Sequence, residues 1–597
     1  MMTAHSNYTQ ACTRWTVRLV ALLFTLHSSP FLLSFGGQGA LAQTVNLGNI
    51  SQIAQSDPLI ITGTIGTQNT YYHSSVGNGY SSLWNNVFYA NLNIRFYGVS
   101  MPFSLYYSND NTSFSSPHLR FRLNPRYKNW TGYFGQSSMS YSEYVMGMSF
   151  NGVGVEYNDG KRLRFGGFYG ILRNAINDDP TEPFARSPQY KRLGWGFKVG
   201  YGSRENFLDL YFLRAYDRLK SLDEQWQRSI APQENIVIGL KGGVTPVKCL
   251  SLNVNAAASL FSTDTRAQEV ETSEADRWGS IFTTRYSSLA RFAGDVSANL
   301  SLPGISASLY YRMIQPDYTS LGTYYMTNNY QSLGLTLSTT LCRKVSLSAN
   351  FSGQEDNLTN KQLYTTRGLV YSAMASTRFG DLNLSLGYNG YTQKQHDGAA
   401  QVNDTTRVDR RMQSITFTPS YNIDGENLSH TFAVSASLTD NKDLNDFTIH
   451  QSDITSKAIG LSYNLGVKAW EMDFTTSLNH QVSKGMNNRY TSDIASLTTS
   501  RSFLSDEALT VALTASLIYN EIQYQSKSLS IGGDLQMGYN IKRKHLFSLS
   551  AGINKYGDVN PTKTRSTLDA TDISASLNYT YTFSLLEIKK KRPTPDP

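Results

Sequence analysis

The histidines are the residues of this chain best suited to act as catalytic bases, and they are scattered along it. Nucleophilic catalysis needs a base within hydrogen-bond reach of the nucleophile. The sequence has neither a Gly-x-Ser-x-Gly elbow nor a His-Glu-x-x-His metal helix. A composite site built from outer loops stays open, because four histidines fall in or beside expected loops: His73, His118, His396 and His450. We expect no enzyme, no metal site and no cofactor.

Basic side chains alternate with apolar ones in three segments, at residues 119–127, 162–165 and 193–201. Successive side chains of a strand point to opposite faces, so the basic and apolar residues lie on different faces. In a membrane barrel the apolar face meets lipid, where a charge at the mid-plane costs about 2–4 kcal/mol. We therefore expect six basic side chains to face the lumen: Arg120, Arg122, Arg126, Arg162, Arg164 and Lys198.

Two interpretations of these basic residues remain open. A confined cluster of arginines favours anions by Coulomb attraction. The same arginines can instead pair with carboxylates, which would stiffen a wide barrel or hold a loop inside it. The segment Asp264–Asp276 is an acidic candidate for such a loop, since it carries Asp264, Glu269, Glu271, Glu274 and Asp276.

Long alternating segments indicate an all-β transmembrane antiparallel β-barrel. In Asp572–Ser584 the apolar residues from Ile573 to Phe583 share one parity, and polar residues occupy the other. Many segments alternate for about 10 to 15 residues, whereas strands of soluble proteins usually run about 5–6. A tilted strand needs about 9–11 residues to cross the hydrocarbon layer.

Short turns alternate with long polar connections, as periplasmic turns and external loops do in bacterial barrels. Short turns are expected near Leu302-Pro303-Gly304, Gly380-Asp381 and Lys542-Arg543-Lys544, and long loops near Lys394–Arg410 and Gly557–Asp569. This pattern predicts about 26 strands, within a range of about 22 to 28, with both termini at the periplasmic end. The segments Arg120–Ser142 and Trp278–Leu289 leave the number uncertain by two strands.

A period of about 40 residues also fits some β-propellers. A propeller blade needs four short strands, however, and here each period holds two long ones. The uneven lengths of the segments also disfavour a fibrous β-solenoid.

Composition agrees with a membrane barrel. The 597 residues include 12% aromatic and 16% charged residues, with 38 Tyr and 28 Phe, and the mean hydropathy is −0.35. A helical membrane protein needs apolar runs of about 20 residues, and none follows the first 42 positions. A barrel strand needs only one apolar face, so its average can stay polar.

The chain divides into four expected parts. Residues 1–42 resemble a signal peptide, with Arg14 and Arg18 before an apolar stretch and an Ala40-Leu41-Ala42 cleavage site before Gln43. Residues 43–58 form a short periplasmic segment, residues 59–584 the barrel, and residues 585–597 a basic periplasmic tail. The tail either binds a partner or anionic headgroups or is a solvated end. We expect no plug domain, because the strand pattern begins only about 16 residues after the expected cleavage site.

Several stretches resemble a family of large, uncharacterised outer-membrane β-barrels of Bacteroidota. They are YGVSMPFSLYYSN, RFRLNPRY, GQSSMSYSEY, NGVGVEYNDGKRLRFGGFYG and GWGFKVGY, within Tyr97–Gly202. The resemblance implies a β-barrel in the cell outer membrane. It brings no activity and no functional residues.

Two functions are therefore expected. The first is a porin-like channel or transporter with inward-folded loops, since 16–18 strands already leave an aqueous channel. The second is the membrane scaffold of a complex for secretion, surface export or outer-membrane assembly. The expected partners are outer-membrane lipid and lipopolysaccharide. A protein that fills or caps the barrel is a further candidate partner. We expect no binding of nucleic acid.

Overall fold

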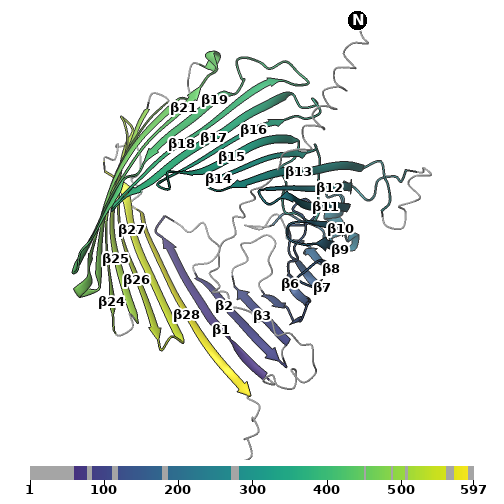
Figure 1. Ribbon diagram of the computed structural model, residues 1–597, viewed down its shortest axis with the longest axis horizontal. Helices are drawn as coiled ribbons and strands as arrows, with labels where there is room; N and C mark the ends of the chain where they lie inside the picture. Colours follow the sequence, from purple (N-terminus) through teal and green to yellow (C-terminus); the bar gives the residue numbers. More distant parts are fainter. Residues whose placement is uncertain are drawn as a thin grey trace, which may run out of the picture.

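The computed structural model describes residues 59–76, 84–97, 99–109, 119–177, 186–270, 282–448, 452–485, 488–504, 508–559 and 570–588. These residues form one antiparallel sheet that closes on itself as a barrel (Figure 1). The expected signal peptide, the segment 43–58 and the end of the tail lie outside the described residues.

The first half of the barrel contains β1 to β14 in chain order. Their bounds are β1 Leu59–Ser74, β2 Trp84–Phe96, β3 Val99–Ser108, β4 Leu119–Leu123, β5 Arg126–Tyr127, β6 Trp130–Ser137, β7 Phe150–Asn158, β8 Leu163–Arg173, β9 Arg192–Gly202, β10 Phe207–Asp217, β11 Glu234–Val247, β12 Leu250–Ser262, β13 Ser288–Leu302 and β14 Ile305–Ile314.

The second half contains β15 to β28. Their bounds are β15 Tyr330–Leu341, β16 Val345–Asp356, β17 Tyr364–Phe379, β18 Leu382–Asp397, β19 Asp409–Phe417, β20 Ser420–Asp424, β21 Leu428–Asp443, β22 Ile454–Val467, β23 Met472–Gly485, β24 Asn488–Phe503, β25 Leu509–Ile522, β26 Ser526–Ile541, β27 His545–Asp558 and β28 Ala570–Ile588.

The barrel has 26 strands, as the sequence predicts. Two pairs of segments are halves of one interrupted strand, because both halves lie between the same two neighbours. β4 and β5 both pair with β3 and β6, and β19 and β20 both pair with β18 and β21. β1 then pairs with β28 from Leu59–Ile588 to Ser74–Asp572, which closes the barrel (Figure 1). β28 extends beyond the expected boundary at Ser584.

Strand alternation gives the barrel an apolar outer face. Val153 and Val155 of β7, and Phe197 and Val199 of β9, are exposed on it. Large apolar side chains remain exposed in a chain of this size only where something other than water covers them, and the hydrocarbon of a membrane does so. The opposite parity faces the lumen.

One end of the barrel carries tight turns and the two strand ends that close it. Leu302 pairs with Ile305 and Phe379 with Leu382 across such turns. The other end carries the longer connections, but not at every hairpin. Gly485 pairs with Asn488 between β23 and β24, so the alternation of short and long connections breaks down there.

Helices are few and short in the described residues. They are η1 Leu219–Ser221, α3 Glu224–Gln227, η3 Asp446–Thr448 and η4 Lys468–Trp470. None of the described helices is long and apolar enough to cross a membrane.

Candidate functional site: the lumenal wall and its two inward-folded loops

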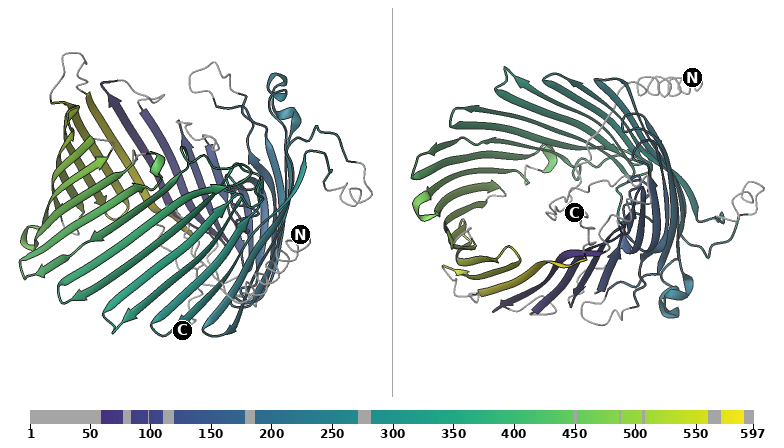
Figure 2. Two further views of the ribbon diagram at one scale, coloured as in Figure 1. Left: turned by 90° about the horizontal axis from the view of Figure 1, so that it is seen from above. Right: turned by 60° about the horizontal axis from the view of Figure 1, so that its bottom comes forward.

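Two connections fold onto the inner face of the barrel wall at β7 to β14. The first is residues 138–149, between β6 and β7, and the second is residues 315–329, between β14 and β15. We call them the first and second inner loops. Their apolar side chains form one buried cluster with lumen-facing residues of the wall. Figure 2 shows this part of the wall from two directions.

The first inner loop is apolar and fully buried at its centre. The exposed fraction is 1% for Tyr144 and 0% for Val145. Ser142 donates a hydrogen bond to Asn255 of β12 at 2.7 Å, and the Tyr144 hydroxyl donates to Asp295 of β13 at 2.6 Å. Burial raises the pKa of Tyr144, so its hydroxyl stays a donor. Burying each large apolar side chain contributes about 1.5–3 kcal/mol, which offsets the entropy lost on ordering the loop.

The second inner loop lies against both the first loop and the wall. The Tyr318 hydroxyl donates to the carbonyl of Tyr144 at 2.8 Å, and Ser320 donates to the carbonyl of Val145 at 2.6 Å. Asn235 of β11 accepts the Leu321 N–H at 3.0 Å through its side-chain oxygen. The two loops are therefore held as one layer on the wall.

Glycines on the lumenal face make room for the first inner loop. A Cβ built at Gly239 of β11 would overlap Cγ2 of Val145, and one at Gly154 of β7 would lie 3.2 Å from the Met139 sulfur. A Cβ at Gly166 of β8 or at Gly196 of β9 would also lie within 4 Å of this loop, at Met139 and Tyr141 respectively. Other lumenal glycines of β7 to β11 border neighbouring strands instead: Gly152, Gly170, Gly194, Gly200 and Gly243.

Two of the six basic residues form ion pairs across the lumenal wall. Lys198 of β9 contacts Glu156 of β7 at 2.8 Å and donates to the Ser140 carbonyl of the first inner loop at 2.9 Å. Arg164 of β8 contacts Asp209 of β10 at 2.8 Å. These pairs fit the structural interpretation of the basic residues.

A third ion pair attaches the first inner loop to the wall. Arg312 of β14 contacts Glu143 of the loop at 3.1 Å and Asp295 of β13 at 3.6 Å. The six basic residues expected from the sequence do not include Arg312, although it alternates with apolar neighbours in the same way.

The other four basic residues expected from the sequence are Arg120, Arg122, Arg126 and Arg162. Arg120 stacks on the Tyr106 ring at 4.3 Å. Arg122 and Arg126 form no ion pair within the described ranges, and Arg126 pairs in register with Thr131, which pairs with Glu156. Arg162 lies in the turn before β8, where its N–H donates to Asp159 at 2.7 Å.

The acidic segment Asp264–Asp276 does not supply the partners of Arg164 and Lys198. Asp264 pairs with Arg266 at 2.8 Å, and Glu269 pairs with Arg285 at 3.4 Å. Glu271, Glu274 and Asp276 lie outside the described residues. The carboxylates that do pair with these two cations lie two strands away, each across a glycine of the intervening strand. Gly200 of β9 lies in register between Arg164 and Asp209, and Gly166 of β8 lies between Lys198 and Glu156.

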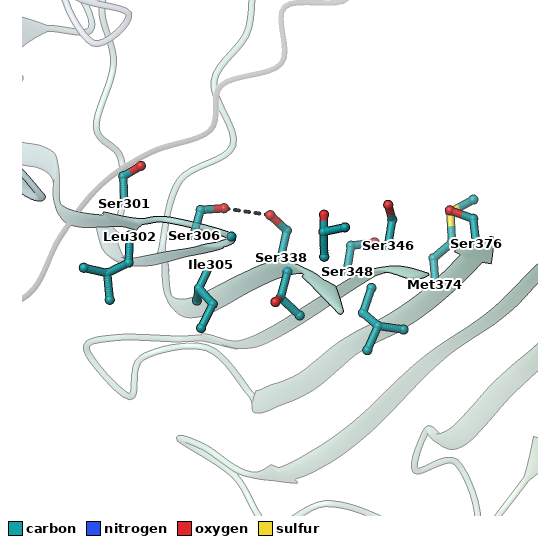
Figure 3. Close-up of a pocket in the computed structure, with 13 residues that line it drawn as sticks. Ser301, Leu302, Ile305, Ser306, Ser338, Ser346, Ser348, Met374 and Ser376 are labelled. Atoms are coloured by element: carbon teal, nitrogen blue, oxygen red, sulfur yellow. Dashed lines mark hydrogen bonds between the residues drawn. The ribbon is translucent and has the colours of Figure 1, made fainter. Parts of the chain in front are cut away.

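The rest of the lumenal wall is lined by hydroxyl and amide groups. Near the tight turns of β13 to β17, serines line a pocket of about 390 Å³, in which Ser306 and Ser338 are 2.7 Å apart (Figure 3). Figure 3 shows Ser301 and Ser306 on the side opposite Leu302 and Ile305. Similar contacts join further strands: Thr336–Asn350, Ser456–Ser483, Ser477–Ser496 and Thr498–Thr514.

The other residue types considered for chemistry are dispersed. His430 contacts Tyr463, His480 contacts Asp493, and His545 contacts Tyr579. Cys249 and Cys342 are free thiols. Within the described residues no group of three or more His, Cys, Asp or Glu could hold a metal.

The sequence predicted inward-folded loops but did not identify these two connections. For the first inner loop the signal is an apolar run between strands, where an external loop would be polar: Met139, Tyr141, Tyr144, Val145 and Met146. The glycines on the lumenal parity of the following strands are the complementary signal.

No protein-family profile and no curated protein matches this chain. Among solved structures, the chain is similar to the P pilus usher (PapC) translocation pore at 12% identity and a TM-score of 0.35, covering 88% of this chain and 100% of that one. OccAB3 of Acinetobacter baumannii gives 12% identity and a TM-score of 0.30, covering 66% and 99%. OpdK of Pseudomonas aeruginosa gives 12% and 0.28, covering 59% and 94%. No activity is carried over from them.

The closed 26-strand barrel, its apolar outer face and its polar lumen define a transmembrane antiparallel β-barrel.

Proposed function

We propose that this protein is an outer-membrane channel for small hydrophilic solutes, and that its two inner loops narrow its lumen. The observation that carries the proposal is the attachment of residues 138–149 and 315–329 to the lumenal wall. A barrel of this strand number is wide, so a fixed layer on its inner face reduces the cross-section without a plug domain.

The lining supports passage rather than tight binding. Hydroxyl and amide groups line much of the wall, and they offer weak hydrogen bonds that a hydrated solute exchanges for water. Glu156 neutralises Lys198, and Asp209 neutralises Arg164. Arg122 and Arg126 add positive charge on the same face, so we expect a weak preference for anions.

Planar-bilayer recording of the purified protein tests the channel. We expect stable ohmic steps that become larger when residues 139–148 are replaced by a Gly/Ser linker. A matched replacement of residues 398–407, whose described hydrogen bonds are to other outer segments such as Gln362, should leave the step size unchanged.

The scaffold function predicts a different result. Two results together would overturn the channel proposal. The barrel would show no conductance with or without the first inner loop, and it would co-purify with a stoichiometric protein partner in mild detergent. The expected periplasmic segment at residues 43–58 and the basic tail would then be the first segments to test for partner binding.

A further inference from the structure

A basic groove lies on the lipid-facing side of β22, β23 and β24, close to the tight β23–β24 hairpin. Its volume is about 580 Å³, and its lining includes Thr455, Lys457, Ile459, His480, Lys484 and Arg489. We call it the rim groove. It lies outside the lumen, so nothing in the proposed channel accounts for it.

Register places the groove on the outer face. Ile459 is the Cα partner of His480, and Leu461 is the partner of Leu478. Ile459, Leu461 and Leu478 are each about half exposed on the apolar face of the barrel. The lumenal parity of the same strands carries Ser456 and Ser483, which contact each other at 2.7 Å. The basic side chains therefore stand directly beyond an apolar band that meets acyl chains.

The groove also stands at the end of the barrel away from the tight-turn ring. Gly485 and Asn488 form the last pair of the β23–β24 hairpin, whereas Met472 and Arg501 lie at the opposite end of the same pair of strands. In an outer-membrane barrel the ring of tight turns faces the periplasm. The groove therefore lies at the level of the outer leaflet headgroups.

The positive charges of the groove lie close together and have no carboxylate to neutralise them in the described residues. Lys484 and Arg489 are direct partners across the hairpin, and Lys484 also pairs in register with Thr455, two residues before Lys457. Like charges directly opposite each other destabilise a strand pair. Within the described part of the chain, none of these three cations forms an ion pair, and the nearby carboxylate of Asp493 is engaged by His480 at 2.6 Å.

Several other cations on the same face are paired with carboxylates, whereas the groove gathers three that form no ion pair in the described residues. Lys394 pairs with Asp409 at 2.8 Å, Lys442 with Asp453 at 3.1 Å, and Lys527 with Glu521 at 3.2 Å. The protein thus supplies carboxylates along this belt but leaves Lys457, Lys484 and Arg489 to an external anion.

We propose that the rim groove binds the phosphorylated headgroup of an outer-leaflet glycolipid of the lipid A type. Its phosphates would lie among Lys457, Lys484 and Arg489, and its acyl chains would lie along Ile459 and Leu478. Basic residues that face a membrane interface attract anionic headgroups in this way. Because the groove is on the lipid-facing side, a solute that passes through the lumen does not reach it.

Binding of defined lipids, measured by native mass spectrometry in detergent, tests the assignment. The double variant Lys484→Gln/Arg489→Gln should bind bisphosphorylated lipid A about 30-fold more weakly than the wild type, since each charge near an anionic surface contributes about 1 kcal/mol. The matched control Arg343→Gln/Lys344→Gln removes the same charge from a tight turn at the other end and should bind as the wild type does.

Stability without lipid separates loss of a site from loss of folding. The double variant should unfold at the same or a higher temperature than the wild type, because it removes a like-charge pair, and only the wild type should gain stability when lipid A is added. Equal binding by the wild type and the double variant would overturn the proposal. So would equal binding of dephosphorylated lipid A or phosphatidylglycerol, or full stabilisation by inorganic phosphate alone.

Discussion

Gly239 of β11 lies directly beneath Val145 of the first inner loop, and a Cβ on that glycine would overlap Cγ2 of the valine. The space left by the absent side chain of Gly239 is thus occupied by the side chain of Val145. The sequence of one strand fixes where a loop almost a hundred positions earlier in the chain can lie.

Gly239→Ala should loosen the first inner loop and enlarge the single-channel conductance. The added methyl group must displace Val145, and overpacking of a buried site costs about 1–3 kcal/mol. The matched control is Gly242→Ala on the lipid face of the same strand, where the nearest atoms are 3.5 Å from the new Cβ. If both variants conduct like the wild type, the loop does not narrow the lumen.

Asn235→Ala should release the second inner loop. The Asn235 side chain is fully buried, accepts the Leu321 N–H and donates to Ser259 at 2.8 Å. Loss of a buried partner leaves these groups unsatisfied at a cost of about 1–3 kcal/mol. Limited proteolysis should cut within residues 315–329 in this variant.

The control for this release is Asn253→Ala on β12, whose side chain makes no hydrogen bond within the described residues. It should resist the protease as the wild type does. Equal protection of Asn235→Ala would show that packing of Tyr318 and Leu321 alone holds the loop.

Much of the fold follows from alternation because a membrane strand has one lipid face along its whole length. That constraint predicts the 26 strands, the tight turns and the start of β1 near Leu59. The two interrupted strands lie where alternation fails. Pro125 falls between β4 and β5, and Pro419 falls between β19 and β20, and a proline cannot donate a ladder hydrogen bond.

The site was less accessible from the sequence, because its parts meet only across the closed sheet. Arg164 and Lys198 are recognisable as lumenal from parity, but their partners Asp209 and Glu156 depend on strand register. The inner loops depend on the shape of the wall, which local alternation does not report. A glycine at a lumen-facing position does not change a hydropathy pattern. It nevertheless allows another segment to approach the strand closely.

Asp159 should make the β7–β8 turn sensitive to acid. Its carboxylate accepts the N–H groups of Lys161, Arg162 and Leu163 at 2.7, 2.7 and 3.0 Å, and the bond from Lys161 above all lowers the pKa of Asp159. A folded-state pKa below the unfolded one stabilises the fold fully above the unfolded pKa of about 4, and the contribution is lost as the pH falls through the folded value.

Asp159→Asn should therefore unfold at a lower temperature than the wild type at neutral pH, and the difference should shrink below about pH 4. Asp381→Asn in the tight turn between β17 and β18 is the control, since its side chain makes no hydrogen bond in the described ranges. A difference that is constant across pH would show that the carboxylate charge is not what stabilises the turn.

Lys198 and Glu156 should set ion selectivity in opposite directions. Their side chains are both mostly buried and lie 2.8 Å apart on the lumenal wall, so removing either one leaves the other charge without its partner. Lys198→Gln leaves the carboxylate and should shift the reversal potential in a salt gradient towards cations. Glu156→Gln leaves Lys198 without its carboxylate and should shift the reversal potential towards anions. Each variant should lose about 1–3 kcal/mol of stability.

The opposite signs distinguish a lumenal charge from a general loss of structure, because damage to the barrel would move both variants the same way. Arg122→Gln/Arg126→Gln should also shift selectivity towards cations, but with little change in stability, since these arginines form no ion pair in the described part of the chain. Arg162→Gln, in the β7–β8 turn, is the matched control for loss of one arginine. A double variant that keeps the wild-type reversal potential would place the ion path away from β4 and β5, and would leave the paired residues as structural alone.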